Sequence, residues 1–268
     1  MSLSAMSTPT PAQVPSHVES GEGPPLVFLH SMAGSSASWS EQFAAMSANH
    51  RCIAWDMPGF GESPSAEHTS MTEMSDLVVR MLDFLGIAEP AHLVGLSVGG
   101  MIAQECAVRH PERFASLVIL DSAAQFGNGS AANSDEWAAT MIATINATPV
   151  PDFCREMVQS ITASGLSAEA TARGVAAMSR ATKPGLRLAT RLIAGHDTVS
   201  ALPGMLLPTL VIVGEHDPET PVAYAQRLAE LIPHATLSVI PDCGHLSSLE
   251  APIAVNQALR AHLKRTAR

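Results

Sequence analysis

The sequence predicts an α/β fold, in which a mostly parallel central sheet is flanked by helices and carries an inserted helical lid. Three observations predict this fold. Short apolar runs alternate with segments of helical spacing between Leu26 and Leu120, and such alternation is typical of right-handed βαβ units. Residues 124–203 then contain helical stretches without a clear strand. The alternation resumes at Leu210 and continues to Leu263.

The elements of the first half follow from local patterns. Four short apolar runs predict buried strands, at residues 26–29, 51–55, 92–95 and 114–120. Three intervening segments predict helices, at residues 38–46, 71–85 and 99–109. In the second of these, apolar side chains recur on one helical face, and Gly86 is placed to end the helix.

The second half returns to the same sheet after the lid. Strands and helices are predicted to alternate there, at residues 210–213, 222–231, 236–240 and 253–263. We therefore expect a core of residues 21–123 and 204–268, with a helical cap of residues 124–203 inserted between its two parts. Residues 1–20, rich in Ser, Thr, Pro and Ala, predict a flexible tail without the basic start or apolar run of a secretory signal.

Composition and charge restrict the classes of function. The chain has 268 residues, of which 46% are hydrophobic, and its formal net charge is −10. An acidic chain does not suit nucleic acid or anionic membrane surfaces as partners, and no stretch is long and apolar enough to span a bilayer. The four cysteines have no metal-binding spacing, so we expect reduced thiols, no metal and a cytoplasmic protein. The sequence leaves a homodimer open.

The segment Gly95-Leu96-Ser97-Val98-Gly99 has the pattern G-x-S-x-G. It lies between a predicted strand and a predicted helix, where this pattern forms a sharp turn that exposes a nucleophilic serine. Glycines are required on both sides because side chains there would clash in the strained turn. The N-terminus of the following helix would favour negative charge at the reaction centre. Ser97 is therefore the predicted nucleophile.

A serine hydroxyl is a weak nucleophile and needs a neighbouring base. With this type of turn the chain order is serine, acid, histidine. Asp217 follows one predicted strand of the second half, and His245 follows the next. His245 would take the serine proton, and Asp217 would orient the imidazole and stabilise its charge. The rivals for the acid are Asp121, at the end of the strand before the cap, and, less strongly, Glu215 and Asp242.

Two backbone N–H groups are the usual donors to the oxyanion that forms when an ester carbonyl is attacked. We predict that they belong to Val98, directly after the nucleophile, and to Met32, in the loop after the first central strand. His30 is expected to brace this loop. The Ser31 hydroxyl could line the site as a substrate contact, although satisfying backbone groups of the loop is the favoured interpretation.

These motifs occur in the order found in the α/β-hydrolase superfamily, which the chain resembles from about Gly21 to Leu263. Within it, the chain is most similar to the 3-oxoadipate enol-lactonases. The likeness lies in three segments: Ser31-Met32-Ala33, Gly95 to Gln104 with Pro111-Glu112-Arg113 beyond it, and His245 to Glu250. The resemblance implies hydrolysis of a lactone or small carboxylic ester, without a cofactor, by Ser97, Asp217 and His245. His30 stands where those enzymes tend to have Asn.

The cap is expected to contact the substrate, a small-molecule ester or lactone. Trp137 and Met141 are candidate apolar contacts. An enol-lactone carries a carboxylate, which would favour an arginine partner, and the cap offers six cations: Arg155, Arg173, Arg180, Lys183, Arg187 and Arg191. Three alternatives stay open: hydrolysis of a carbon–carbon bond in a diketone, a haloperoxidase-like activity, and a small-molecule receptor with slow turnover.

Overall fold

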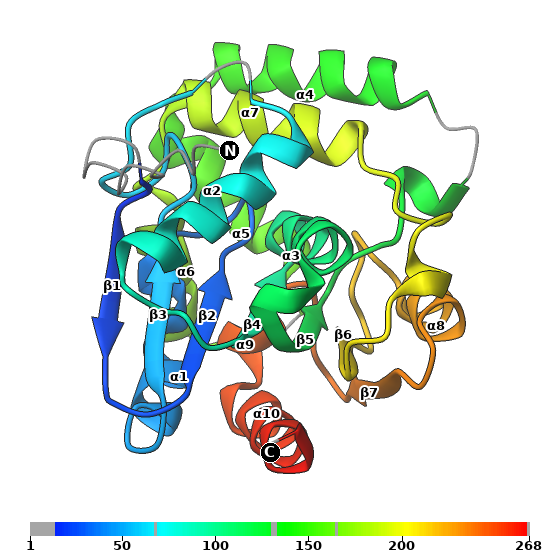
Figure 1. The fold of residues 1–268 in the computed structure, drawn as a ribbon. Helices are drawn as coiled ribbons and strands as arrows, with labels where there is room; N and C mark the ends of the chain where they lie inside the picture. Colours follow the sequence, from blue (N-terminus) through cyan, green and yellow to red (C-terminus); the bar gives the residue numbers. More distant parts are fainter. Residues whose placement is uncertain (1–13, 67–68, 130–132, 164–165, 267–268) are drawn as a thin grey trace, which may run out of the picture.

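The computed structural model describes residues 14–66, 69–129, 133–163 and 166–266. In these residues seven strands form one sheet in the order β1-β3-β2-β4-β5-β6-β7 (Figure 1). The strands are β1 (His17–Ser20), β2 (Pro25–Leu29), β3 (Arg51–Trp55), β4 (Ala91–Leu96), β5 (Phe114–Leu120), β6 (Thr209–Gly214) and β7 (Thr236–Ile240). β1 pairs antiparallel with β3, and all other neighbouring strands are parallel. The predicted mostly parallel sheet is confirmed.

The first strand corrects the predicted N-terminal tail. Residues 1–13 lie outside the described residues, but His17–Ser20 forms β1, which pairs with β3 in the register Ser20↔Cys52. The expected flexible tail of residues 1–20 is therefore wrong for its last four residues. The sequence gives little signal here because β1 is a short edge strand whose last three residues are exposed, so it lacks the apolar run of a buried strand.

Helices cover both faces of the sheet. The core helices are α1 (Ser40–Met46), α2 (Met71–Phe84), α3 (Val98–Arg109), α8 (Val222–Leu231) and α10 (Pro252–Thr266). The connection from β2 to β3 runs along the sheet in the opposite direction to the later ones. Right-handed connections therefore place α1 on one face and α2, α3 and α8 on the other. Helix α10 packs against α1.

The chain adds β3 on one side of β2 and the later strands on the other, so the order of the strands reverses between β2 and β4. This point fixes where a ligand can bind. In open parallel sheets, ligands bind beyond the carboxyl ends of the strands at such a switch point. The predicted oxyanion loop follows β2, and Ser97 follows β4. The fold alone therefore brings these two segments together at one edge of the sheet.

Four helices are inserted between β5 and β6: α4 (Ser134–Ala147), α5 (Val150–Ile161), α6 (Ala168–Met178) and α7 (Lys183–Ala194). We call them the cap. Helices α4 and α7 pack side by side across the end of the sheet to which the parallel strands point (Figure 1), and α5 packs on α6. The described part of this insertion holds no strand. The limits of the cap at residues 124 and 203 stay a prediction.

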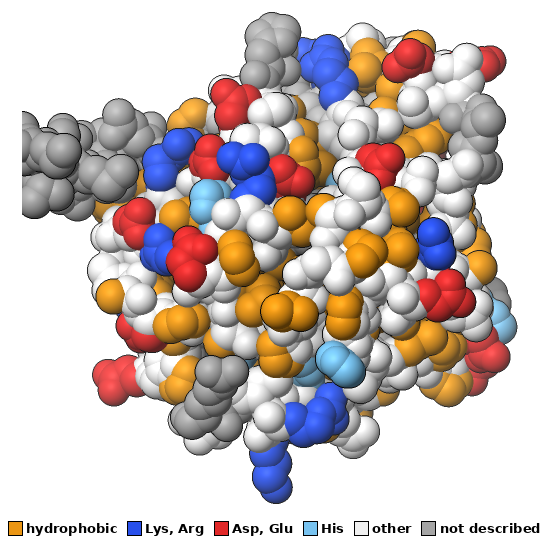
Figure 2. Space-filling model, turned by 45° about the vertical axis from the view of Figure 1, so that its right-hand side comes forward, with side chains coloured by type: hydrophobic (Ala, Val, Ile, Leu, Met, Phe, Trp, Pro, Cys, Tyr) orange, Lys and Arg blue, Asp and Glu red, His pale blue; other side chains and the backbone are white. Residues whose placement is uncertain are grey.

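The core lies in the centre of the sheet. Strands β2, β4 and β6 are buried along their whole length, because helices cover both of their faces. All four cysteines are free and buried. In the described residues, no helix combines the length and the apolar character that crossing a membrane requires. On the face drawn in Figure 2, blue and red side chains adjoin at several places, and the described Lys and Arg side chains form no large basic patch.

Candidate active site

The turn between β4 and α3 holds Ser97 in a strained conformation, with φ 56° and ψ −121°. Such backbone strain in a residue other than glycine is common at functional sites. A Cβ atom on Gly95 would collide with the carbonyl of Gly99, and one on Gly99 would collide with the carbonyl of Leu29. Both glycines are therefore required, as the sequence predicts. The carbonyl of Ser97 accepts a hydrogen bond of 2.8 Å from the Ser122 hydroxyl, which holds the turn in place.

The structure brings the three predicted catalytic residues together from the loops after β4, β6 and β7. The Nε2 atom of His245 lies 2.9 Å from Ser97 Oγ. Its Nδ1 atom lies 2.9 Å from each carboxylate oxygen of Asp217. In the tautomer that carries its proton on Nδ1, the imidazole donates to Asp217 and accepts from the Ser97 hydroxyl. This is the arrangement that activates a serine.

Asp217 is held as a carboxylate by its own turn. The amides of Glu219 and Thr220 donate to Oδ1 at 2.8 and 2.9 Å, and the Thr220 hydroxyl donates to Oδ2 at 2.7 Å. Burial opposes a charge here, but His245 and the Thr220 hydrogen bonds outweigh it and lower the pKa of Asp217. Sequence analysis missed Thr220. The spacing Asp-x-x-Thr after a strand, typical of a side-chain-stabilised turn, could have found it.

The pKa of His245 shifts in the opposite direction to that of Asp217. Its burial lowers the pKa of the imidazole, but the charge and hydrogen bond of Asp217, with smaller effects of Asp121 and Glu219, outweigh burial and raise it. The negative groups around the ring therefore stabilise the imidazolium, the form that appears when His245 takes the Ser97 proton.

Asp121 is not the partner of the histidine. Its side chain is fully buried and its backbone has φ 44°. Oδ1 accepts a hydrogen bond from the Gly214 amide and Oδ2 one from the Ser247 amide, each at 3.0 Å. Burial raises the pKa of Asp121 to about 7. The carboxyl group therefore joins the end of β6, before the acid loop, to the segment that follows His245.

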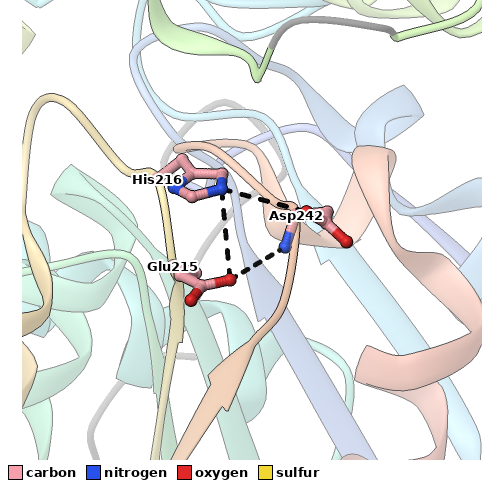
Figure 3. Close-up of side chains that lie close together, drawn as sticks. All are labelled: Glu215, His216 and Asp242. Carbon is pink, nitrogen blue, oxygen red and sulfur yellow. Dashed lines mark hydrogen bonds and ion pairs between the residues drawn. The ribbon is translucent and has the colours of Figure 1, made fainter.

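The weaker rivals for the acid lie on the surface with His216. Figure 3 shows Glu215, His216 and Asp242 at the ends of β6 and β7. The Nε2 atom of His216 lies 4.0 Å from Glu215 and 3.9 Å from Asp242, and all three side chains are exposed. Their ligand atoms lie within 4.8 Å of one another, as a metal site needs. Because three exposed side chains alone do not define a site, we assign the cluster no role.

Glu250 fixes the loop that carries His245. Its carboxylate accepts hydrogen bonds from the amides of Gly244 and Leu246, on both sides of His245, at 3.0 and 2.9 Å. It also accepts one of 2.8 Å from Ala163, just beyond cap helix α5. The His245 amide itself donates to the carbonyl of Ile161, the last residue of α5, at 2.8 Å. The role of Glu250 was missed, although the segment from His245 to Glu250 carries part of the family resemblance.

The predicted oxyanion loop lies beside the nucleophile. His30 braces it as expected: Nδ1 lies 2.7 Å from the Ser31 carbonyl, and Nε2 accepts from the Met57 amide at 2.9 Å. Met32 lines the same cavity as Ser97. Within the described residues, the amides of Met32 and Val98 have no hydrogen-bond acceptor. Both remain available as donors, and their role at an oxyanion stays a prediction.

Ser97 and His245 line a cavity of about 290 Å³ between the strand ends and the cap. Most of its walls are apolar. Apart from Ser97 and His245, the lining residues are Ser31, Met32, Ala33, Met101, Ala123, Gln125, Phe126, Gly127, Trp137, Met141, Met157, Ile161, Ile193, Glu219, Thr220 and Tyr224. The cavity therefore joins the predicted catalytic loops to three cap helices, α4, α5 and α7.

The three predicted substrate contacts, Ser31, Trp137 and Met141, all line this cavity. The Ser31 hydroxyl makes no hydrogen bond to the described residues, so the favoured interpretation, that it satisfies the backbone of its loop, is wrong. Trp137, Met141 and Met157 also line a second space of about 290 Å³ between α4 and α5. They form the wall between the two spaces. None of the six cap cations lines the cavity that contains Ser97.

This geometry can be compared with known proteins. The model of the alpha/beta hydrolase fold family matches residues 24–252. The chain therefore belongs to this family, and it is a hydrolase.

The chain is similar to several enzymes of this family. It is 31% identical to 3-oxoadipate enol-lactonase 2 of Acinetobacter baylyi, over 90% of this chain and 89% of the relative. Its structure matches that of a thermophilic esterase from Thermogutta terrifontis with a TM-score of 0.87 and 26% identity, over 94% of both chains. It also matches Est816, described as an N-acyl homoserine lactone degrading enzyme, with a TM-score of 0.79 and 31% identity, over 92% of this chain and 95% of that one.

Proposed function

We propose that the chain is a serine hydrolase that cleaves a small carboxylic ester or lactone through an acyl-enzyme. The observation that carries the proposal is the continuous hydrogen-bonded line from Ser97 through His245 to Asp217, at 2.9 Å for each contact, on the wall of a largely apolar cavity. A serine hydroxyl needs this line to become a nucleophile at neutral pH.

The reaction follows from the positions of these groups. The Ser97 Oγ atom attacks the carbonyl carbon while its proton passes to Nε2 of His245. The oxyanion accepts hydrogen bonds from the free amides of Met32 and Val98. The carbon–oxygen bond to the leaving group then breaks, and the imidazolium returns its proton to that oxygen. A water molecule hydrolyses the acyl-enzyme by the same steps and regenerates Ser97.

The three similar enzymes named above support ester-type substrates. Their names and titles include a lactonase, an esterase and an enzyme that degrades an acylated lactone. Esters and lactones share one reacting group, a carbonyl carbon bonded to an alkoxy oxygen, and the same attack cleaves both. In a lactone the leaving alkoxide stays attached to the acyl group.

Covalent labelling tests this proposal directly. An alkyl fluorophosphonate forms a bond between phosphorus and the attacking oxygen and releases fluoride. We expect one adduct per chain on the peptide that contains Ser97, together with loss of p-nitrophenyl butyrate hydrolysis. The S97A variant should form no adduct. Hydrolysis that survives in S97A contradicts the proposal, whereas labelling and a burst without steady turnover on an ester and lactone panel identify a receptor instead.

A further inference from the structure

We propose that the cavity takes an uncharged acyl group, and that Glu219 at its rim excludes substrates whose acyl group carries a carboxylate. This inference rests on the proposed ester or lactone hydrolysis and names its substrate class. The proposed substrate differs from the one that the enol-lactonase resemblance implies, because an enol-lactone of that type carries a free carboxylate. The evidence is the set of charges at the cavity.

Among the described residues that line the cavity, Glu219 is the one charged group besides the catalytic His245. Its side chain is exposed and has no ion pair or hydrogen bond with any described residue. Its backbone cannot move away without cost, because its amide donates to Asp217 Oδ1 at 2.8 Å. The turn that holds the catalytic acid therefore also places Glu219 beside the cavity, where its side chain has no salt-bridge partner among the described residues.

The cations of the cap are bonded elsewhere. Arg155 pairs with Asp152 at 2.9 Å, and Arg173 pairs with Glu41 at 3.3 Å. Arg180 pairs with Glu62 at 3.1 Å. Each of these ion pairs lies outside the cavity lining.

The other two cations with assigned partners both contact Asn146, near the end of α4. Lys183 donates to its carbonyl at 2.7 Å, and Arg187 donates to its side-chain oxygen at 3.1 Å. Arg191 also lies outside the described lining of the cavity. No described Lys or Arg therefore lines the cavity that contains Ser97.

An anionic acyl group meets two penalties in this cavity. Its carboxylate loses its hydrating water when it enters the cavity. Apolar walls such as Met141, Met157 and Ile193 offer no hydrogen bond to replace that water. The substrate carboxylate also approaches the carboxylate of Glu219. Repulsion between these like charges weakens the binding of an anionic substrate. Screening by solvent weakens the second effect, because Glu219 is exposed. We expect a preference for neutral over anionic acyl groups on the order of tenfold or more.

Two p-nitrophenyl esters of matched shape test the proposal. The 6-methylheptanoate is neutral, and the adipate monoester replaces its branched end by a carboxylate. We expect the native chain to hydrolyse the neutral ester with at least about tenfold higher kcat/KM, and E219Q to reduce this ratio at least threefold or so. The ratio cancels any effect that is common to both esters. E112Q, an equal charge change at an exposed residue outside the cavity lining, should leave the ratio unchanged.

A binding measurement separates the two proposals. The corresponding amides, 6-methylheptanamide and adipate monoamide, can be titrated into S97A by calorimetry, which requires no turnover. Tighter binding of the neutral amide supports the inference, even if neither ester is hydrolysed and the proposed function fails. Equal kcat/KM for the two esters, an unchanged ratio in E219Q, or equal binding of the two amides overturns the inference while leaving serine hydrolysis intact.

Discussion

The loops at the strand ends and the walls contributed by the cap differ in how they are held. Asp217, Asp121 and Glu250 each accept at least two hydrogen bonds from backbone amides, so the loops are bound to one another at many polar points. The cap walls around Trp137 and Met141 consist mainly of apolar side chains, whose contacts have no direction. The difference teaches that directional hydrogen bonds fix the geometry of the loops, whereas apolar packing alone shapes the cap walls.

The largest expected effect concerns Ser97, the predicted nucleophile in these loops. S97A removes the nucleophile, and because triad members act as a unit, kcat should fall on the order of 10⁴-fold or more. The exposed Ser20 on β1, an edge strand of the sheet, offers the matched control. S20A removes the same hydroxyl group at a position outside the cavity lining. Steady-state hydrolysis of p-nitrophenyl butyrate measures both variants. A comparable loss in S20A would mean that the assay reports folding rather than catalysis.

The second prediction concerns Asp121, which acts as a positioning residue. D121A leaves the buried amides of Gly214 and Ser247 without acceptors, and each costs roughly 1–3 kcal/mol. We expect the free energy of unfolding to fall by about 2–4 kcal/mol in denaturant titrations. We also expect kcat to fall by up to about 100-fold through misplacement of the triad, with little change in KM.

The conservative variant D121N distinguishes positioning from general destabilisation. It keeps one acceptor oxygen, so it should retain part of the stability and part of kcat. The surface change D135A on α4, an exposed position, serves as the control. If D121A were as stable and as active as D135A, the two hydrogen bonds of Asp121 would not matter to the site.

The third prediction tests the cap. Trp137 separates the cavity from the second space between α4 and α5, and W137A should join them. The ratio of kcat/KM for p-nitrophenyl decanoate to that for the butyrate should rise about threefold to tenfold, since each buried CH₂ contributes about 0.8 kcal/mol at most. W137F, which keeps much of the wall, should give a smaller rise. A ratio that stays the same in W137A would show that longer chains do not extend past this residue.

The smallest effect concerns pH. His245 must be neutral to accept the Ser97 proton, so kcat/KM should rise with pH as the imidazolium loses its proton. Asp217, Asp121 and Glu219 all stabilise the imidazolium. E219Q removes one of these charges and lowers the pKa, so the rising limb should move to lower pH, by only a few tenths of a unit because Glu219 is exposed. E112Q should not move it, and high salt should reduce the shift.

The contrast between the regions also explains what could be predicted from the sequence. Ser97, Asp217 and His245 each lie in a short motif at the end of a predicted strand, and parallel strand ends meet at one edge. Local patterns therefore located three side chains that the structure brings into hydrogen-bond contact, and their catalytic role stays a prediction. The two hydrogen bonds of Asp121 could not be foreseen, because they join residues 93 and 126 positions apart.

The cap was only partly predictable. Trp137 and Met141 are four residues apart on α4, so helical spacing places them on one face, and both line the cavity. Phe126, Ile193 and Tyr224 reach the cavity from three separate segments, and no periodicity relates them. The cap cations suggested an anion partner because composition reports which charges exist, whereas only the packing shows that none of them lines the cavity.

The hydrogen bond from the His245 amide to Ile161 makes an interlock between cap and base. If α5 swung outward as a hinged lid, it would pull on the backbone that carries the imidazole and break the proton path to Ser97. While α5 is displaced to admit a substrate on that side, the enzyme could not turn over.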